Sequence, residues 1–118
     1  MKKCYIAGKI GDLPESEYKL NFEQAKEDVM KLGFFPVSPV DLPHEHDRSW
    51  SSYMREDLTE MLRCQAVFAL SNWKDSRGAK IEVKLAKKIG LEIIEQGSPE
   101  TNRRIIKASL PLKVVSQN

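Results

Sequence analysis

The feature that most constrains the fold is the alternation of short apolar runs with amphipathic segments of helical period. Four apolar runs have the length of strands: 3–7, 34–37, 66–70 and 91–94. Three intervening segments carry apolar residues at steps of three and four, which is typical of one helix face: 15–32, 50–64 and 77–89. Such alternation predicts parallel strands joined by right-handed crossovers. We therefore expect an α/β fold with an open, doubly wound parallel sheet of four or five strands flanked by helices.

Several helix boundaries are marked by particular residues. Gly33 and Gly90 follow the first and third helical segments, and Ser49 is placed to cap the second. Ser98 followed by Pro99 predicts the start of a last helix over 99–108. No repeat or linker interrupts the 118 residues, so we expect residues 1–118 to form a single domain.

Composition narrows the classes of partner. The chain has 19 Lys and Arg against 17 Asp and Glu, a balance too even to favour binding of a nucleic acid polymer. No apolar run approaches the ~20 residues of a membrane span, so we expect a cytoplasmic protein without a membrane partner. Cys4 and Cys64 lack the C-x-x-C spacing of a zinc site and are expected to be buried, reduced thiols. No metal or cofactor is expected.

The loops that follow the predicted strands are where a ligand should bind. In open sheets of the flavodoxin-like kind, ligands bind outside the carboxyl ends of the strands. Those loops are 8–14, 38–50 and 71–78. In the first loop, Gly8 and Gly11 either cradle a phosphate with their amides or form a plain turn. In the second, His44-Glu45-His46-Asp47 is interpreted as a solvated loop in preference to a metal site.

Two carboxylates lie within apolar helix faces. Asp57 falls among Trp50, Tyr53, Met54, Leu58 and Met61, whereas Glu56 and Glu60 fall on the polar flank. Glu82 falls among Gly78, Ala79, Leu85, Ala86 and Ile89. A buried, unpaired carboxylate is costly, so such residues are hydrogen-bonded, paired or functional. Each acid alone is better explained by a solvated position at the end of its stripe. Together, beside predicted ligand loops, they suggest a shared site.

Three motifs resemble the nucleoside 2-deoxyribosyltransferases and the related 2′-deoxynucleoside 5′-phosphate N-hydrolases. The motifs are Tyr5-Ile6-Ala7-Gly8, Tyr53-Met54-Arg55-Glu56-Asp57-Leu58 and Asp75-Ser76-Arg77-Gly78-Ala79-Lys80-Ile81-Glu82. The resemblance covers most of residues 3–95 and is strongest to short bacterial and phage members with a Trp before the third motif, where Trp73 stands. It implies cleavage or transfer at an N-glycosidic bond, with a nucleoside or nucleotide as the small-molecule partner. It also implies a homo-oligomer.

The resemblance also implies roles for individual residues. Glu82 matches the nucleophile that attacks the anomeric carbon of deoxyribose to give a covalent glycosyl-enzyme, a chemistry that suits a carboxylate. Tyr5 matches the residue that orients this nucleophile, and Asp57 matches the acid near the departing base. The substrate-binding residues are expected to be Gly8, Lys9, Trp73, Asp75, Ser76, Gly78 and Ala79. Trp50 is expected to pack in the core or a lid.

The position six residues before Glu82 bears on the substrate's 5′ group. It is Ser76 here, as in the nucleotide hydrolases, whereas transferases that use free nucleosides carry Asp. Ser at a helix N-terminus favours an anion, with Lys9 and Arg77 expected nearby. Asp75 would instead favour the uncharged 5′-hydroxyl if it faces the ligand. The alternative to an enzyme is a nucleotide-binding module of the same fold that lacks catalysis.

Overall fold

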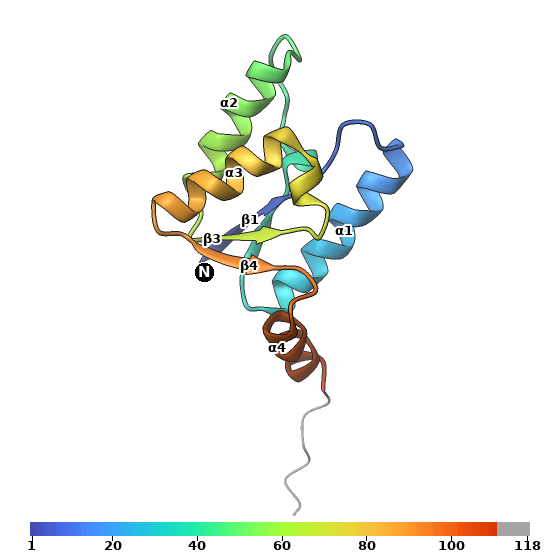
Figure 1. Cartoon of the computed structure of the whole chain (residues 1–118), viewed down its shortest axis with the longest axis vertical. Helices are drawn as coiled ribbons and strands as arrows, with labels where there is room; N and C mark the ends of the chain where they lie inside the picture. The colour runs from blue at the N-terminus through green and yellow to red at the C-terminus, as the bar shows by residue number, and fades with distance from the viewer. Residues whose placement is uncertain (111–118) are drawn as a thin grey trace, which may run out of the picture.

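The structure is a computed structural model that describes residues 1–110. Strands and helices alternate along the chain (Figure 1). The four strands are β1 (Lys3–Ala7), β2 (Phe35–Val37), β3 (Ala66–Ala69) and β4 (Glu92–Glu95). The four α-helices are α1 (Glu15–Lys31), α2 (Trp50–Met61), α3 (Arg77–Lys88) and α4 (Pro99–Ser109). Two short 3₁₀ turns, η1 (Pro39–Asp41) and η2 (Trp73–Asp75), lie in the connections that follow β2 and β3.

The strands form one parallel sheet in the order β2-β1-β3-β4. The expected doubly wound α/β fold is thereby confirmed, with four strands among the described residues. The chain starts in the middle of the sheet, runs outward to β2 and then crosses to β3. The topological switch point therefore lies between β1 and β3, whose carboxyl ends are aligned by the pairing of Ala7 with Ala69. Pro36 lies on the edge strand β2, where its missing amide costs no ladder hydrogen bond.

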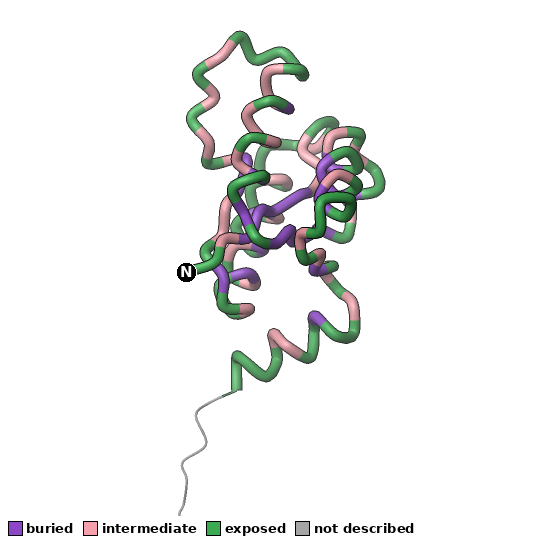
Figure 2. Tube along the Cα trace, turned by 90° about the vertical axis from the view of Figure 1, so that its left-hand side faces the viewer, coloured by how far each residue is buried: buried purple, intermediate pink, exposed green. Residues whose placement is uncertain are grey.

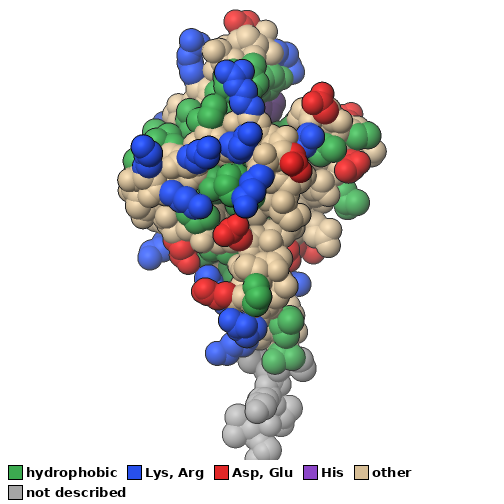
Figure 3. Space-filling view, in the orientation of Figure 1, with side chains coloured by type: hydrophobic (Ala, Val, Ile, Leu, Met, Phe, Trp, Pro, Cys, Tyr) green, Lys and Arg blue, Asp and Glu red, His purple; other side chains and the backbone are tan. Residues whose placement is uncertain are grey.

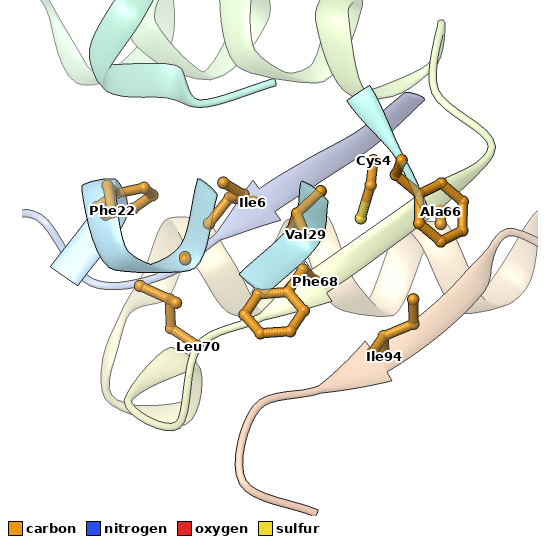
Figure 4. Packing of buried hydrophobic residues seen from close by; sticks show 10 residues of the cluster. Cys4, Ile6, Phe22, Val29, Ala66, Phe68, Leu70 and Ile94 are labelled. Atoms are coloured by element: carbon orange, nitrogen blue, oxygen red, sulfur yellow. The ribbon is translucent and has the colours of Figure 1, made fainter. Parts of the chain in front are cut away.

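Helices cover both faces of the sheet. On one face α1 buries Phe22, Ala25 and Val29 against Ile6 of β1 and Phe68 of β3 (Figure 4). On the other face, side chains of α2 and α3 pack against Tyr5, Ala7, Val67 and Ala69. Alternate strand residues thus supply the two halves of the core, as the period-two geometry of a strand requires. The buried stretches concentrate in the sheet and the inner sides of the helices (Figure 2).

Side-chain caps explain where three of the helices begin. Ser49, Ser76 and Ser98 each accept a hydrogen bond from the backbone amide three residues later, at the starts of α2, α3 and α4. Gly33 and Gly90 follow α1 and α3 with φ of 93° and 85°, a left-handed conformation that glycine adopts at no steric cost.

Two residues predicted to lie on buried helix faces are more exposed than expected. Trp50 is 44 % exposed and Ile89 is 49 % exposed, because each stands at an end of its helix, where the helix leaves the sheet. Cys4 and Cys64 are buried, as expected, and burial raises the pKa of both thiols. Within residues 1–110, no helix has the length and apolar character needed to cross a membrane.

Candidate functional site

A cleft of about 560 Å³ opens at the carboxyl ends of the strands. Its walls come from the loops after β1 and β2, from the first turns of α1, from α2 and from the start of α3. Four of the expected substrate-binding residues line it: Gly8, Ser76, Gly78 and Ala79. Asp57 and Glu82 also line it, from two different helices. The cleft therefore lies beside the switch point, where open parallel sheets bind ligands.

Glu82 is a buried acid held by one strong hydrogen bond. Its side chain is 4 % exposed, and its Oε2 accepts a hydrogen bond of 2.7 Å from the Tyr5 hydroxyl. Tyr5 lies in β1 and is fully buried behind the carboxylate, so it touches Glu82 without lining the cleft. Burial, together with the charges of Glu82 and Asp57, raises the pKa of Tyr5 well above its usual value. The phenol therefore stays protonated and acts as a fixed donor.

Asp57 faces the same cleft from α2 and lacks a partner for one oxygen. Its Oδ1 is buried and accepts no hydrogen bond from any residue in the described part of the chain. An unsatisfied buried carboxylate oxygen is unfavourable and requires an explanation. Asp57 lines the cleft, but this oxygen has no exposed surface of its own, so a ligand would reach it only by displacing the groups that cover it.

The pKa values of both acids are raised. Burial raises the pKa of Glu82 to about 8; the hydrogen bond from Tyr5 opposes this rise, and the charge of Asp57 adds to it. Burial also raises the pKa of Asp57 to about 7, with a further rise from Glu56 and a smaller opposing effect of His44. Two carboxyl groups that influence each other titrate as a pair. The site therefore holds one or two protons near neutral pH, which is where acid–base chemistry requires them.

The start of α3 brings backbone amides to the cleft. Ser76 caps the helix by accepting a hydrogen bond of 3.1 Å from the amide of Ala79. The amides of Arg77 and Gly78 belong to the first helical turn, where no intrahelical acceptor exists. A Cβ atom at Gly78 would lie 3.1 Å from Sδ of Met54, so a side chain there would press against α2.

The loop after β1 is held close to β3. A Cβ atom at Gly8 would lie 2.3 Å from Cδ1 of Leu70, inside the core. The amide of Lys9 donates a hydrogen bond of 3.0 Å to the side chain of Asn72, which follows β3. These contacts set the width of the cleft at the switch point, and they need the small residue at position 8.

Three of the expected substrate-binding residues do not line the cleft. Trp73 is buried in the core beneath α3, where the ammonium groups of Lys74 and Lys87 lie over its ring. Asp75 is exposed, and Lys9 is outside the lining as well. The second indole, that of Trp50, does line the cleft. Its face is covered by the guanidinium of Arg77, 3.9 Å from the ring centre.

Several residues line the cleft that the sequence did not assign to a ligand site. Tyr18 and Lys19 reach the cleft from α1, and His44 and Arg48 reach it from residues 42–49, which we call the strap. Arg48 supplies positive charge to the cleft, whereas the charge of Lys19 is paired with the carboxylate of Glu15, also on α1, at 2.9 Å. Glu15 and Lys19 lie on exposed helix surface, where no periodicity identifies them, whereas Tyr18 is half-buried and belongs to the apolar face of its helix.

Glu56, on the flank of α2, gathers the two histidines of the strap. Its Oε1 lies 2.6 Å from Nδ1 of His44 and 3.3 Å from Nε2 of His46, and its Oε2 accepts a hydrogen bond of 2.8 Å from the amide of His44. The donor atoms lie within 4.8 Å of one another, close enough for a metal ion to be considered. Tyr53, whose ring packs edge-on against both imidazoles, is the residue of α2 that could have indicated from the sequence where the two histidines lie.

The basic surface lies away from the cleft. Lys and Arg side chains gather over α3 in Figure 3, and the sequence places five of them on that helix: Arg77, Lys80, Lys84, Lys87 and Lys88. All five are exposed, on the side of the helix opposite to the buried Glu82. This surface is consistent with the amphipathic pattern expected of a helix that covers a sheet.

Comparisons with known proteins agree with this architecture. A solved 2-deoxyribosyltransferase from the psychrotolerant bacterium Bacillus psychrosaccharolyticus superposes with a TM-score of 0.60 at 21 % sequence identity, over 79 % of this chain and 70 % of that one. This similarity establishes a shared fold. No curated protein sequence matches the chain. A family model described as a domain of unknown function, DUF4406, matches residues 2–95. The chain therefore belongs to the DUF4406 family.

Proposed function

We propose that this protein cleaves or transfers at the N-glycosidic bond of a deoxynucleoside or its 5′-monophosphate, through a covalent intermediate on Glu82. The observation that carries the proposal is the arrangement of Glu82, Tyr5 and Asp57: a buried acid held at 2.7 Å by a phenol, with a second acid in the same cleft. The shared fold with a 2-deoxyribosyltransferase and the resemblance of the three motifs support it.

The groups present suffice for a double displacement. Because Tyr5 occupies Oε2 of Glu82, Oε1 is the oxygen that attacks the anomeric carbon. The N-glycosidic bond breaks, its electron pair leaves with the base, and Asp57 supplies the proton that neutralises the base. Water or a second base then attacks the same carbon, the ester bond breaks, and Glu82 is restored as a carboxylate. The second nucleophile returns its proton to Asp57.

The proton must be on Asp57 and absent from Glu82 when the base departs. Burial raises the pKa values of both acids to near neutral, and the two carboxyl groups titrate as a pair, so the singly protonated site shares one proton between them. Positive charge that develops beside Glu82 as the glycosidic bond breaks favours the carboxylate form of Glu82 and leaves the proton on Asp57. The nucleophile would thus be activated by the substrate itself.

The 5′ group is proposed to be a phosphate. Ser76 and the first amides of α3 meet at the cleft, and a helix N-terminus favours an anion. The nearby cations differ from those expected. Arg48 lines the cleft, and Lys19 lines it while paired with Glu15; Lys9 does not line it, and Arg77 covers Trp50. Titration calorimetry with a deoxynucleoside and its monophosphate tests this. Ser76→Asp should reverse the preference by adding like charge; equal affinities in the wild-type protein would reject the phosphate.

Release of free base is the primary test. The protein is incubated with each deoxynucleoside and each monophosphate, and the base is separated by chromatography. We expect release by the wild-type protein and by Glu60→Gln, whose carboxylate pairs with Arg63 outside the cleft, and none by Glu82→Gln. Binding without base release for every compound would support the alternative of a non-catalytic nucleotide-binding module.

A further inference from the structure

We propose that Glu56 is a positioning residue that latches the strap, residues 42–49, over the cleft and so places Arg48 against the bound substrate. The identity of that substrate rests on the function proposed above, whereas the latch itself does not. Glu56 and Asp57 are neighbours on α2, yet they serve different surfaces. Asp57 lines the cleft, and Glu56 holds the loop that forms one of its walls.

Three N–H groups of the strap converge on one carboxylate. The backbone amide of His44 donates to Oε2 of Glu56 at 2.8 Å, and the two imidazoles meet Oε1 at 2.6 and 3.3 Å. The side chains of Glu56, His44 and His46 are 18 %, 22 % and 16 % exposed. Burial alone would raise the pKa of Glu56, but its hydrogen bonds with His44 and His46 outweigh this and lower it. The carboxylate therefore remains an ionised acceptor.

The tautomer of His46 decides between a latch and a metal site. The amide of Arg48 donates a hydrogen bond of 2.9 Å to Nδ1 of His46, so that nitrogen carries a lone pair. A neutral imidazole then carries its proton on Nε2, the atom that faces Glu56. A metal ion at this place would need the lone pair on Nε2, and the proton moved to Nδ1 would confront the Arg48 amide. The hydrogen bonds of His44, His46 and the Arg48 amide are all formed without a metal ion, which favours the latch.

The strap has a backbone that needs such support. His44 and Arg48 have φ of 54° and 63°, although neither is glycine. Left-handed conformations of this kind are unfavourable and persist where surrounding contacts enforce them. Here the contacts are Glu56 and the ring of Tyr53, whose centre lies 5.1 Å from that of His44 and 4.6 Å from that of His46. Without the latch we expect the strap to relax.

Arg48 is the side chain that the latch presents. It lines the cleft, and none of the ion pairs among the described residues includes it. The backbone amide of Arg48 donates a hydrogen bond to His46, which in turn contacts Glu56. An arginine fixed at its backbone and free at its guanidinium suits recognition of an anionic group, such as a phosphate, by two parallel hydrogen bonds. Arg48 is therefore a specificity-determining residue that depends on Glu56.

Hydrogen exchange tests the latch without any substrate. Glu56→Gln keeps the shape of the side chain but presents an NH₂ group to the imidazole donors of the strap. We expect the amides of His44 and Arg48 to exchange about tenfold faster in Glu56→Gln than in the wild-type protein, since opening of the strap becomes easier. Glu60→Gln, one turn along the same helix and outside the latch, is the matched control and should exchange like wild type.

Steady-state kinetics of base release from a deoxynucleoside monophosphate test the consequence. Glu56→Gln should raise KM about tenfold, because it acts on placement of the strap; loss of the Glu56 charge also lowers the pKa of Asp57, so the alkaline limb of kcat should move to lower pH. Arg48→Gly suits the left-handed backbone; it should raise KM similarly while leaving exchange at His44 unchanged. Unchanged strap exchange in Glu56→Gln would overturn the proposal. So would stoichiometric binding of Zn²⁺ by the wild-type protein that Glu56→Gln abolishes. Absence of base release from every substrate would count against the proposed function, and exchange would still decide the latch.

Discussion

Replacing Glu82 by Gln should raise the stability of the protein at alkaline pH while abolishing turnover. The folded state holds a proton on Glu82 up to a pKa of about 8, whereas an unfolded glutamate releases it near its model value of 4.5. Between these values the folded protein binds more protons than the unfolded chain, so the free energy of unfolding falls as pH rises. Gln cannot ionise, and the variant loses this dependence.

The magnitude follows from the size of the shift. A difference of about 3.5 units, at roughly 1.4 kcal/mol per unit, corresponds to on the order of 5 kcal/mol lost by the wild-type protein between pH 4.5 and pH 9. The Gln side chain keeps the acceptor for Tyr5 but buries an NH₂ group without a defined partner, which costs about 1–3 kcal/mol. The net gain at pH 9 is therefore about 2–4 kcal/mol. At pH 5 the wild-type protein has lost less than about 1 kcal/mol, so the variant should be up to about 2 kcal/mol less stable than the wild type.

Urea unfolding of the two proteins and of Glu60→Gln, measured from pH 5 to pH 9, is the assay. The curves of the wild type and Glu60→Gln should fall together, and that of Glu82→Gln should fall less steeply, with Asp57 accounting for the remaining slope. A Glu82→Gln variant that is less stable than wild type at pH 9 would refute the reasoning. It would mean that the carboxylate stabilises the fold through the Tyr5 hydroxyl, and that its ionisation in the folded protein does not lower the free energy of unfolding.

Three further substitutions give separate expectations. Asp57→Asn should lower kcat by at least about tenfold and remove the alkaline limb of the pH–rate profile, because the proton donor is lost. Tyr5→Phe should shift the acidic limb upward, since the hydrogen bond from Tyr5 lowers the pKa of Glu82; an unshifted limb would exclude Glu82 as the group titrated. Gly8→Ala should destabilise the fold by about 1–3 kcal/mol in chemical unfolding, through the clash with Leu70; unchanged stability would show that the core yields there.

The order of elements and the location of the cleft could be predicted because they follow from local patterns. Helical period marks α1, α2 and α3, uninterrupted apolar runs mark β1 and β3, and alternation implies parallel strands. The carboxyl-end rule then places the ligand loops together. Asp57 and Glu82 were selected by the same logic: an acid within an apolar stripe is buried, and both do line the cleft.

The details of the site depend on contacts that a linear pattern does not contain. Periodicity indicates that a residue faces the sheet, but it does not distinguish the core from the cleft. The pattern therefore could not show that Trp73 lies in the core and Trp50 at the cleft. Glu56 was placed on a polar flank, which is correct for its helix. Its role becomes visible only when the strap folds back over α2 and brings His44 and His46 to it.

The measurement that tests the central claim most directly is detection of the covalent intermediate. The wild-type protein is mixed with a deoxynucleoside monophosphate, quenched rapidly with acid, digested and examined by peptide mass spectrometry, with Glu82→Gln treated in parallel. We predict a mass increase equal to one deoxyribosyl phosphate on the peptide that contains Glu82, appearing together with free base and absent from the variant. Release of base at an undiminished rate by Glu82→Gln, or modification of a different carboxylate, would contradict the account.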